Sequence, residues 1–237
     1  MPEILAPAGD MEKLKTAFAF GADAVYAGIP KFSLRTREAG FSSENLQAAI
    51  DYTHSIEKKI YLTLNIYPHN LKVDAFLKEL DIVVPMKPDA LIMADPGMIA
   101  MARERYPDMP VHLSTQANTV NWMAVKFWRD LGLSRVILSR ELKLDDIQMM
   151  HKEVPDIELE TFVHGAICIS YSGRCLISNY LHGRDANQGT CTNSCRWEYK
   201  LAYEKGSLLE VEETQEPYEY NSPPPEGFYV KESHRPD

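Results

Sequence analysis

The sequence predicts an α/β fold of the (β/α)8, TIM-barrel-like type, incomplete in this chain, and three observations support this prediction. Residues 1–165 alternate short apolar runs with amphipathic segments, which is the pattern of repeated βα units. Successive apolar runs begin roughly 26 residues apart, a normal length for one unit. No Gly-x-Gly-x-x-Gly sequence opens an amphipathic segment, and this disfavours a dinucleotide-binding Rossmann domain.

Seven segments are expected to form strands, because each is a short apolar run that ends in a polar residue or a glycine. A closed barrel needs an eighth strand. It is either the segment Tyr199–Tyr203 or a segment beyond Asp237. The seven expected strands are Glu3–Ala8, Ala22–Gly28, Lys59–Asn65, Ala90–Asp95, Val111–Ala117, Arg135–Glu141 and Glu158–Gly165.

Six amphipathic segments between these strands are expected to be helices. Asp10 and Ser42 are residue types favoured as N-caps, and Ser42 begins the capping sequence Ser-Ser-Glu-Asn. Pro96 occupies the first position of its segment, where proline is tolerated. The expected helices are Asp10–Phe20, Ser42–Ser55, Val73–Val83, Pro96–Tyr106, Asn121–Leu131 and Leu144–Glu153.

The composition suits one large domain. The chain has 237 residues, of which 45% are hydrophobic, so a substantial core is expected. No run of about 18 apolar residues is present, so we expect no membrane-spanning helix. The first residues lack the basic and apolar regions of a signal peptide. We therefore expect a cytoplasmic protein, in which stable disulfides are uncommon.

The charge is unevenly distributed along the chain. The net charge of −9 argues against a surface coated for nucleic acid. Residues 203–237 contain nine acidic and three basic residues, whereas residues 1–202 contain 25 acidic and 22 basic residues, which leaves a local basic patch possible. Residues 203–237 are also rich in proline, so we expect an extended linker there that ends at a truncation point.

All four cysteines of the chain lie within its last third, at Cys168, Cys175, Cys191 and Cys195. Four thiolates match the ligands of an iron–sulfur cluster or of a structural zinc ion. Six residues separate the first two cysteines, which is long for a zinc site, where two to four are usual. The spacing favours an iron–sulfur cluster, with zinc as the alternative.

Polar side chains stand at the carboxyl ends of the expected strands, where barrels carry their active sites. A single polar strand end needs no explanation beyond its contact with water, and Arg140–Glu141 also suits a structural ion pair. In the predicted barrel, however, the carboxyl ends of all strands meet at one mouth, so we expect this whole set of polar side chains to lie there together. Our catalytic candidates are His164, Arg140, Glu141 and Asp95, and our substrate-binding candidates include Arg35, Arg37, Asn65, Gln116 and Asn118.

Several motifs resemble a known family. The segments Glu160–Cys168 and Gly173–Ser178 resemble the signature of the collagenase-like peptidase family U32. Four further segments are similar to the tRNA hydroxylation branch of that family, and the resemblance covers about residues 3–200. These segments are Asp23–Gly28, Pro88–Met93, Ser139–Leu142 and Asn187–Tyr199.

The resemblance implies an enzyme that hydroxylates C5 of the wobble uridine in the tRNA anticodon loop, with prephenate as the source of the hydroxyl group. It also implies an iron–sulfur cluster, of the 4Fe-4S type, held by the four cysteines. Family members are longer, which supports a truncation after Asp237. We therefore expect barrel units at 1–167, a four-cysteine cluster-binding segment at 168–202 and an acidic, proline-rich linker at 203–237.

The resemblance implies binding roles for several arginine and amide side chains. Prephenate is a dicarboxylate, and guanidinium groups bind carboxylates in a bidentate manner. Asn65, Gln116 and Asn118 have the donors and acceptors to read a uridine that is turned out of the loop. The candidate partners of the dicarboxylate are Arg35, Arg37, Arg140, Arg174 and Arg196.

Two other functions remain in view. The family name suggests a peptidase, but the chain has no His-Glu-x-x-His sequence and no Gly-x-Ser-x-Gly sequence, the motifs of two large hydrolase classes. The other alternative is a non-catalytic RNA-binding module in which the metal is only structural.

Overall fold

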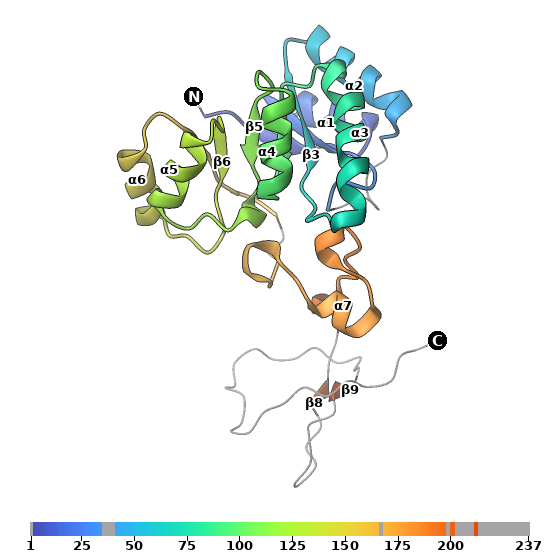
Figure 1. Ribbon diagram of the computed structural model, residues 1–237, viewed down its shortest axis with the longest axis vertical. Helices are drawn as coiled ribbons and strands as arrows, with labels where there is room; N and C mark the ends of the chain where they lie inside the picture. The colour runs from blue at the N-terminus through green and yellow to red at the C-terminus, as the bar shows by residue number, and fades with distance from the viewer. Residues whose placement is uncertain (1, 35–40, 166–167, 198–199, 202–210, 213–237) are drawn as a thin grey trace.

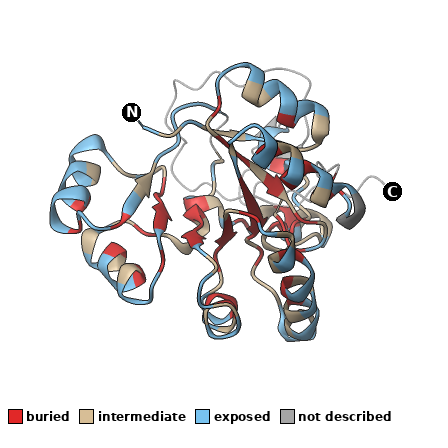
Figure 2. Ribbon diagram, turned by 90° about the horizontal axis from the view of Figure 1, so that it is seen from above, coloured by how far each residue is buried: buried red, intermediate tan, exposed pale blue. Residues whose placement is uncertain are grey.

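Seven parallel strands form one curled sheet in the computed structural model, which describes residues 2–34, 41–165, 168–197, 200–201 and 211–212. The strands are hydrogen-bonded in the order of the sequence, from β1 to β7. Helices cover the outside of the sheet, and the buried strands curl around the centre (Figures 1 and 2). The fold is therefore the TIM-barrel-like arrangement that the sequence predicts.

The seven strands and six helices predicted between residues 3 and 165 are all present. The strands are β1 (Leu5–Pro7), β2 (Ala24–Gly28), β3 (Lys59–Leu64), β4 (Ala90–Met93), β5 (Val111–Leu113), β6 (Arg135–Ile137) and β7 (Glu158–Glu160). The helices between them are α1 (Met11–Ala19), α2 (Ser43–Ser55), α3 (Val73–Val83), α4 (Pro96–Arg105), α5 (Trp122–Asp130) and α6 (Leu144–Glu153), and α7 (Ile177–His182) follows β7.

The helix starts follow from their capping residues. The Asp10 carboxylate accepts a hydrogen bond from the Lys13 backbone N–H at 2.8 Å, so it caps α1 as expected. Ser42 and Asn45 form a capping box at α2, in which each side chain accepts from the other residue's backbone N–H. The predicted starts of these helices are confirmed because the caps satisfy N–H groups that have no partner within the helix.

Six of the seven strands are shorter than predicted at their carboxyl ends, whereas β2 ends at Gly28 as predicted. The sequence predicts Arg135–Glu141, for example, but β6 ends at Ile137. Residues 114–118 leave the sheet in the same way and form the short 3-10 helix η3 (Thr115–Ala117). Polar groups at these ends bond to other segments rather than to neighbouring strands, so the sheet hydrogen bonding stops early.

The segment Tyr199–Tyr203 is not the eighth barrel strand in the described residues. Its described part, β8 (Lys200–Leu201), pairs with β9 (Val211–Glu212) in a separate antiparallel sheet of two strands. This corrects one of the two expectations for the closing strand. The predicted linker at 203–237 lies outside the described residues apart from β9.

Side chains along each strand point alternately outward and inward, so the sheet has an outer core against the helices and an inner core inside the barrel. Ile60, Leu62 and Leu64 of β3 pack outward against the helices, whereas Tyr61 of the same strand points into the barrel. This is the period of two that a strand imposes. The inner core is small and consists of Leu5, Ala24, Tyr26, Tyr61, Ala90, Ile92 and Ile137.

Charged residues close the amino-terminal end of the barrel interior. Arg135 of β6 is only 8% exposed and contacts three carboxylates, Glu3 at 2.8 Å, Glu158 at 2.6 Å and Glu160 at 3.2 Å. Burial opposes ionisation of Glu3, but hydrogen bonds from Lys59 and Arg135 outweigh it and lower its pKa to about 2. We refer to these residues, with Tyr61 and His112, as the barrel floor.

His112 of β5 is a neutral member of the barrel floor. Its ring is 5% exposed and lies edge-on to Tyr61, with the ring centroids 4.6 Å apart. Burial, followed by the charge of Arg135, lowers its pKa to about 3. The imidazole therefore stays uncharged in the folded protein at neutral pH.

Candidate functional site

The carboxyl ends of β3 and β5 bring two of the predicted amide side chains together. Asn65 follows β3, and its Nδ2 lies 3.2 Å from Oε1 of Gln116 in η3 and 3.4 Å from Ser114 Oγ. The Asn65 Oδ1 atom accepts a hydrogen bond from the Leu34 backbone N–H at 3.1 Å. The two amides thus form one polar surface at the mouth of the barrel.

Arg174 binds to this surface from the four-cysteine segment. Its Nε donates to the Gln116 backbone carbonyl at 2.9 Å, and its Nη2 donates to the Tyr67 hydroxyl at 3.0 Å. The Tyr67 hydroxyl donates to the same carbonyl, and the guanidinium lies over the tyrosine ring at 5.1 Å. Burial raises the pKa of Tyr67, Arg174 opposes the rise, and the charge of Asp95 adds to it.

Ser172 makes the second connection between the segment and the mouth. It belongs to the 3-10 helix η4 (Tyr171–Gly173) and is 1% exposed. Its hydroxyl donates to Asn118 Oδ1 at 2.7 Å and lies 3.0 Å from Ser139 Oγ. Its backbone N–H donates to the Glu141 carboxylate. Asn118 and Glu141, both predicted site residues, therefore hold the segment in place.

Asn187 links Cys175 to the end of β3. Its side chain accepts from the Cys175 backbone N–H at 3.1 Å and donates to the Cys175 carbonyl at 2.9 Å. The Asn187 carbonyl in turn accepts from the Tyr67 backbone N–H at 3.1 Å. A continuous set of hydrogen bonds thus connects a cysteine with the strand ends. Figure 1 shows this segment, with α7, at one end of the barrel.

The other predicted site residues lie in different surroundings. Asp95 caps α4 by accepting from the Met98 backbone N–H at 3.0 Å. Arg140 lies over the Phe162 ring at 5.2 Å, and His164 is exposed after β7. Arg196 is exposed in the 3-10 helix η6 (Ser194–Arg196). The predicted Arg35 and Arg37 lie outside the described residues.

All four cysteines are free thiols, and their exposure differs. Cys175 is buried, Cys168 is partly buried, and Cys191 and Cys195 are exposed. Burial raises the pKa of the Cys195 thiol, and the charges of the three other thiols raise it further. The Cys195 sulfur is therefore near enough to the three other thiols to be affected by their charge.

Hydrogen-bond donors surround two of the thiols. Burial opposes ionisation of Cys175, but hydrogen bonds from the Ser170 side chain and from the backbone of residues 177 and 178 lower its pKa overall. The Cys191 sulfur accepts from the Asn193 backbone N–H at 3.4 Å and from the Ser178 hydroxyl at 3.9 Å. Donors of this kind stabilise thiolates, which are the form that binds metal.

Four free thiols are the donor set that both candidate groups use. Structural zinc ions and four-iron clusters are each held by up to four cysteine thiolates. Among the described residues, no three His, Cys, Asp or Glu side chains are placed so that they could hold one metal ion. The thiols therefore suit either group by their chemistry.

Sequence reasoning missed the residues that attach the segment to the barrel. Ser172, Asn187 and Tyr67 make these contacts, and no periodic pattern marks them, because they come from turns. The charged barrel floor was missed as well, although alternation could have found it. Lys59 and Tyr61 of β3, like Glu158 and Glu160 of β7, are polar at every second position of a strand.

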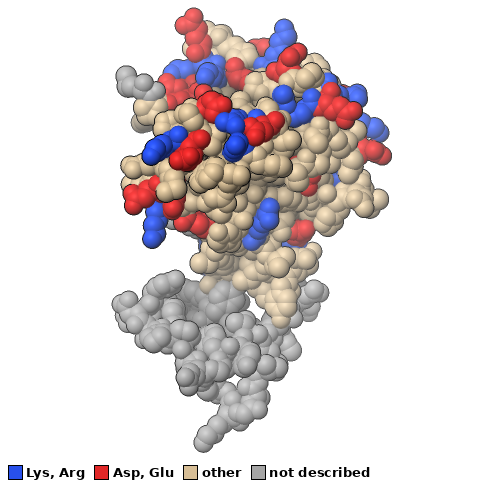
Figure 3. Space-filling model, turned by 60° about the vertical axis from the view of Figure 1, so that its left-hand side comes forward, with Lys and Arg blue, Asp and Glu red and all other residues tan. Residues whose placement is uncertain are grey.

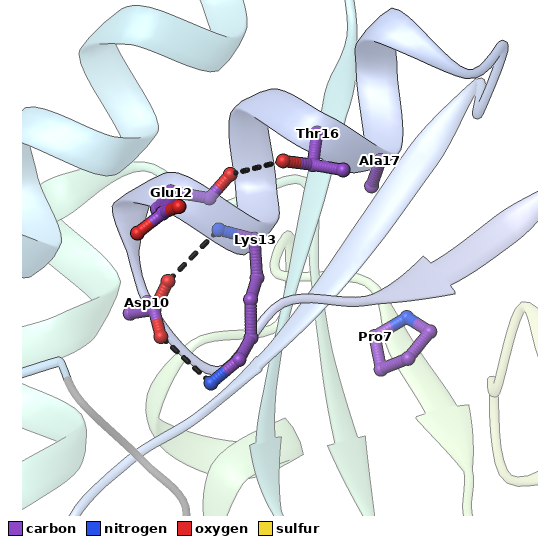
Figure 4. A pocket seen from close by; sticks show the side chains of 6 residues that line it. All are labelled: Pro7, Asp10, Glu12, Lys13, Thr16 and Ala17. Carbon is purple, nitrogen blue, oxygen red and sulfur yellow. Dashed lines mark hydrogen bonds and ion pairs between the residues drawn. The ribbon is translucent and has the colours of Figure 1, made fainter.

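A recess of about 470 Å³ lies beside β1 and α1 (Figure 4). None of the predicted site residues lines it, and the Lys13 ammonium is paired there with the Asp10 carboxylate at 2.7 Å. The residues that line it are Pro7, Asp10, Glu12, Lys13, Thr16 and Ala17.

None of the helices that the structure describes is long and apolar enough to cross a bilayer.

The surface near the cysteines differs in character from the barrel body. Residues 161–197 contain three arginines and one acidic residue, whereas residues 1–160 contain 18 basic and 23 acidic residues. Figure 3 shows acidic and basic side chains mixed over the upper part of the described surface and few charged side chains at its lower end. Large apolar side chains are exposed in this segment, including Tyr171 at 56% and Tyr180 at 62%.

Comparisons with known proteins agree with this architecture. The U32 peptidase Mk0906 has a similar structure, with a TM-score of 0.61 at 15% identity over 71% of each chain, which concerns the fold alone. The tRNA hydroxylation protein P of Haemophilus influenzae is 58% identical over 89% of this chain and 45% of its own length. The 23S rRNA 5-hydroxycytidine C2501 synthase of Escherichia coli is 35% identical over 89% of this chain and 31% of its own length.

The chain spans less than half the length of these two curated relatives. The family model of peptidase family U32 matches residues 9–229, which is nearly all of the chain. This match begins after β1 and includes the strands from β2 to β7 and the four-cysteine segment. The chain therefore belongs to peptidase family U32.

Proposed function

We propose that the protein is an enzyme that hydroxylates tRNA, with C5 of the wobble uridine as its target. Two relatives support the class of reaction, because one is named a tRNA hydroxylation protein and the other a 5-hydroxycytidine synthase acting on rRNA. A 5-hydroxycytidine carries its new hydroxyl on C5 of a pyrimidine, and uridine has the same carbon. We also propose that the protein acts in the cytoplasm, where it meets its tRNA.

One observation carries the proposal. The four-cysteine segment is bonded to the polar carboxyl end of the barrel through Arg174 and Ser172. This is the end at which barrel enzymes hold their substrates. A pyrimidine base that enters the mouth would therefore lie beside both the amides of Asn65 and Gln116 and the segment that carries the cysteines.

The proposed cofactor is an iron–sulfur cluster of the 4Fe-4S type, with zinc as the alternative. Cys168, Cys175, Cys191 and Cys195 would hold it, and they are free thiols. When bound, such a cluster supplies either electron transfer or a fixed charge near the substrate. The thiolates must be deprotonated to bind it, and the hydrogen bonds at Cys175 and Cys191 favour that form.

The proposed co-substrate is the dicarboxylate prephenate. Arg140, Arg174 and Arg196 are the described arginines that could bind its carboxylates. Arg140 follows β6, beside Glu141, at the mouth. Arg174 already donates to Gln116 and Tyr67, so it would bind a carboxylate with its remaining N–H groups. Arg35 and Arg37 remain candidates.

His164 is the proposed general acid or base, because it is exposed after β7 and imidazole is the side chain that most often transfers protons in enzymes. Asp95 and Glu141 are engaged as a helix cap and as an anchor of the segment. We therefore propose that both position the mouth, and that Arg140 binds the developing negative charge of the reaction.

The anticodon loop is the proposed docking partner. Unpaired bases stack on exposed aromatic side chains, and arginines contact the phosphates between them. The segment from 161 to 197 offers both, with Tyr171, Tyr180 and Trp197 exposed and arginines in excess over acidic residues. This local balance accommodates RNA despite the overall charge of −9.

Mass spectrometry of tRNA nucleosides tests the proposal. Cells that lack the protein should lose the 5-hydroxyuridine-derived nucleosides of the wobble position, and the wild-type gene should restore them. Cys168→Ala and Arg140→Ala should fail to restore them, whereas Lys126→Ala, on the outer face of α5, should succeed. Unchanged wobble hydroxylation in the deletion strain would overturn the proposal. Peptide cleavage that survives substitution of all four cysteines would favour a peptidase instead.

A further inference from the structure

Three hydroxyl groups form a hydrogen-bonded chain that ends at the cysteine thiols. Ser178 lies in α7, and Thr192 and Ser194 lie in the loop between Cys191 and Cys195. Ser178 and Ser194 are fully buried, and Thr192 between them is partly buried. Thr192 Oγ1 lies 3.1 Å from Ser178 Oγ and 2.5 Å from Ser194 Oγ. These hydroxyls therefore bond to one another.

The direction of this chain follows from its protons and lone pairs. A hydroxyl has one proton and two acceptor positions. The Ser178 oxygen accepts from the Thr192 backbone N–H at 3.2 Å and from the Thr192 hydroxyl at 3.1 Å. Both acceptor positions are then filled, so the Ser178 proton is left to donate. The Cys191 sulfur lies 3.9 Å away, and the Cys175 thiol is also within reach.

The rest of the chain is oriented by the same argument. Because Thr192 gives its only proton to Ser178, it must accept across the 2.5 Å contact with Ser194. Protons therefore point from Ser194 to Thr192, from Thr192 to Ser178 and from Ser178 to sulfur. Each bond in such a series polarises the next, and the burial of both serines strengthens the bonds that they make.

We propose that Ser178, supported by Thr192 and Ser194, tunes the electron affinity of the iron–sulfur cluster by donating a hydrogen bond to a ligating cysteine sulfur. This inference rests on the cluster assigned under the proposed function. Reduction adds negative charge to a cluster and to its sulfur ligands. A donor aimed at a ligating sulfur stabilises the more negative state, so it raises the reduction potential.

The test uses the whole protein, purified and reconstituted anaerobically, with iron and sulfide content and visible absorbance measured first. Midpoint potentials are then obtained by redox titration followed by absorbance. Ser178→Ala removes the donor to sulfur. Thr192→Val removes the middle hydroxyl but keeps its backbone N–H, and Ser194→Ala removes the far end. Thr190→Val is the matched control, because its hydroxyl donates to the Asp185 carbonyl at 2.7 Å and not to a thiol.

All three substitutions in the chain should shift the midpoint potential to more negative values at unchanged iron content. The shift should be largest for Ser178→Ala, smaller for Thr192→Val and smallest for Ser194→Ala, and Thr190→Val should leave the potential unchanged. A wild-type protein without a cluster would overturn the proposed cofactor and this inference together. If the wild type holds a cluster but Ser178→Ala has the same midpoint potential, this inference alone is overturned. If Ser178→Ala fails to fold or to hold a cluster, Thr192→Val decides in the same way.

Discussion

The backbone N–H of Ser172 lies 2.5 Å from the Glu141 carboxylate, so the four-cysteine segment is bonded directly to the end of β6. Ser172 adopts a left-handed backbone conformation, with φ of 49°, which is uncommon for a residue with a side chain. Its hydroxyl is also engaged, with Asn118 Oδ1 at 2.7 Å. The contacts outweigh the conformational cost and hold the segment at the mouth.

Ser172→Ala should destabilise the protein. The substitution leaves the buried Ser139 hydroxyl and the Asn118 amide without their partner, which costs about 1–3 kcal/mol of unfolding free energy. Urea unfolding followed by circular dichroism measures the loss. Ser55→Ala is the control, because that exposed hydroxyl bonds only to the Tyr52 carbonyl within α2, and its effect should stay within about 0.5 kcal/mol. Equal losses in the two variants would contradict an anchoring role for Ser172.

Arg135→Met should be strongly destabilising. The substitution removes the cation that contacts Glu3, Glu158 and Glu160 and leaves the Glu160 carboxylate, which is only 20% exposed, without its ion pair, at a cost of about 3–5 kcal/mol. Adding Glu160→Gln to this variant should recover part of the loss, because Arg135 is the cation that pairs with Glu160 among the described residues and one uncompensated charge is then gone. Thermal and urea unfolding of the single and double variants measure both effects.

Arg129→Met provides the comparison for Arg135→Met. Arg129 pairs with Asp130 and Asp156 at 2.8 Å each on the surface, where ion pairs contribute about 0–1 kcal/mol. A loss for Arg135→Met no larger than that for Arg129→Met would refute the central role of Arg135 in the barrel floor.

His112→Phe should weaken the pH dependence of stability in mild acid. The folded pKa of His112, about 3, lies below its ordinary value of 6.5. The contribution of the neutral His112 to the free energy of unfolding is therefore complete above pH 6.5. It is lost as the pH falls toward 3, because in this range the unfolded chain binds a proton that the folded protein does not bind. Phenylalanine keeps a ring against Tyr61 and removes this titration.

The expected change in slope for His112→Phe is up to about 1.4 kcal/mol per pH unit between pH 6 and 4.5. Glu3, with a folded pKa of about 2, loses its contribution only below about pH 4.5 in both proteins. Burial raises the pKa of Glu160, which acts in the opposite direction and is common to both. Urea unfolding at several pH values gives the two slopes, and parallel curves would show that His112 does not titrate as described.

Tyr171→Ala and Tyr180→Ala should weaken binding of a tRNA anticodon stem-loop. If each ring stacks on an unpaired base, each substitution costs about 1–3 kcal/mol of binding free energy. The salt dependence should not change, because no charge is removed, whereas Arg196→Ala should reduce the salt slope by about one. Fluorescence anisotropy at several salt concentrations measures these quantities. Phe20→Ala, at an 89% exposed position after α1, is the control and should bind like the wild type.

Much of the fold could be predicted because its signals are local. Apolar runs gave the order of the seven strands, and caps such as Ser42 with Asn45 gave helix starts. The carboxyl ends of the strands were predicted too long, as in β6, where Ser139 and Glu141 bond to Ser172 instead of to a neighbouring strand. Whether an apolar run continues as a strand depends on partners that are distant in sequence.

The sequence by itself determined the class of fold and the set of four thiols, because period, spacing and residue type are written locally. Only the tertiary structure decided how Ser172, Arg174 and Asn187 attach those thiols to the barrel mouth. It also decided that the carboxylates of the barrel floor share Arg135. Contacts between residues up to about 130 positions apart depend on how the strands curl, and no local pattern encodes that curvature.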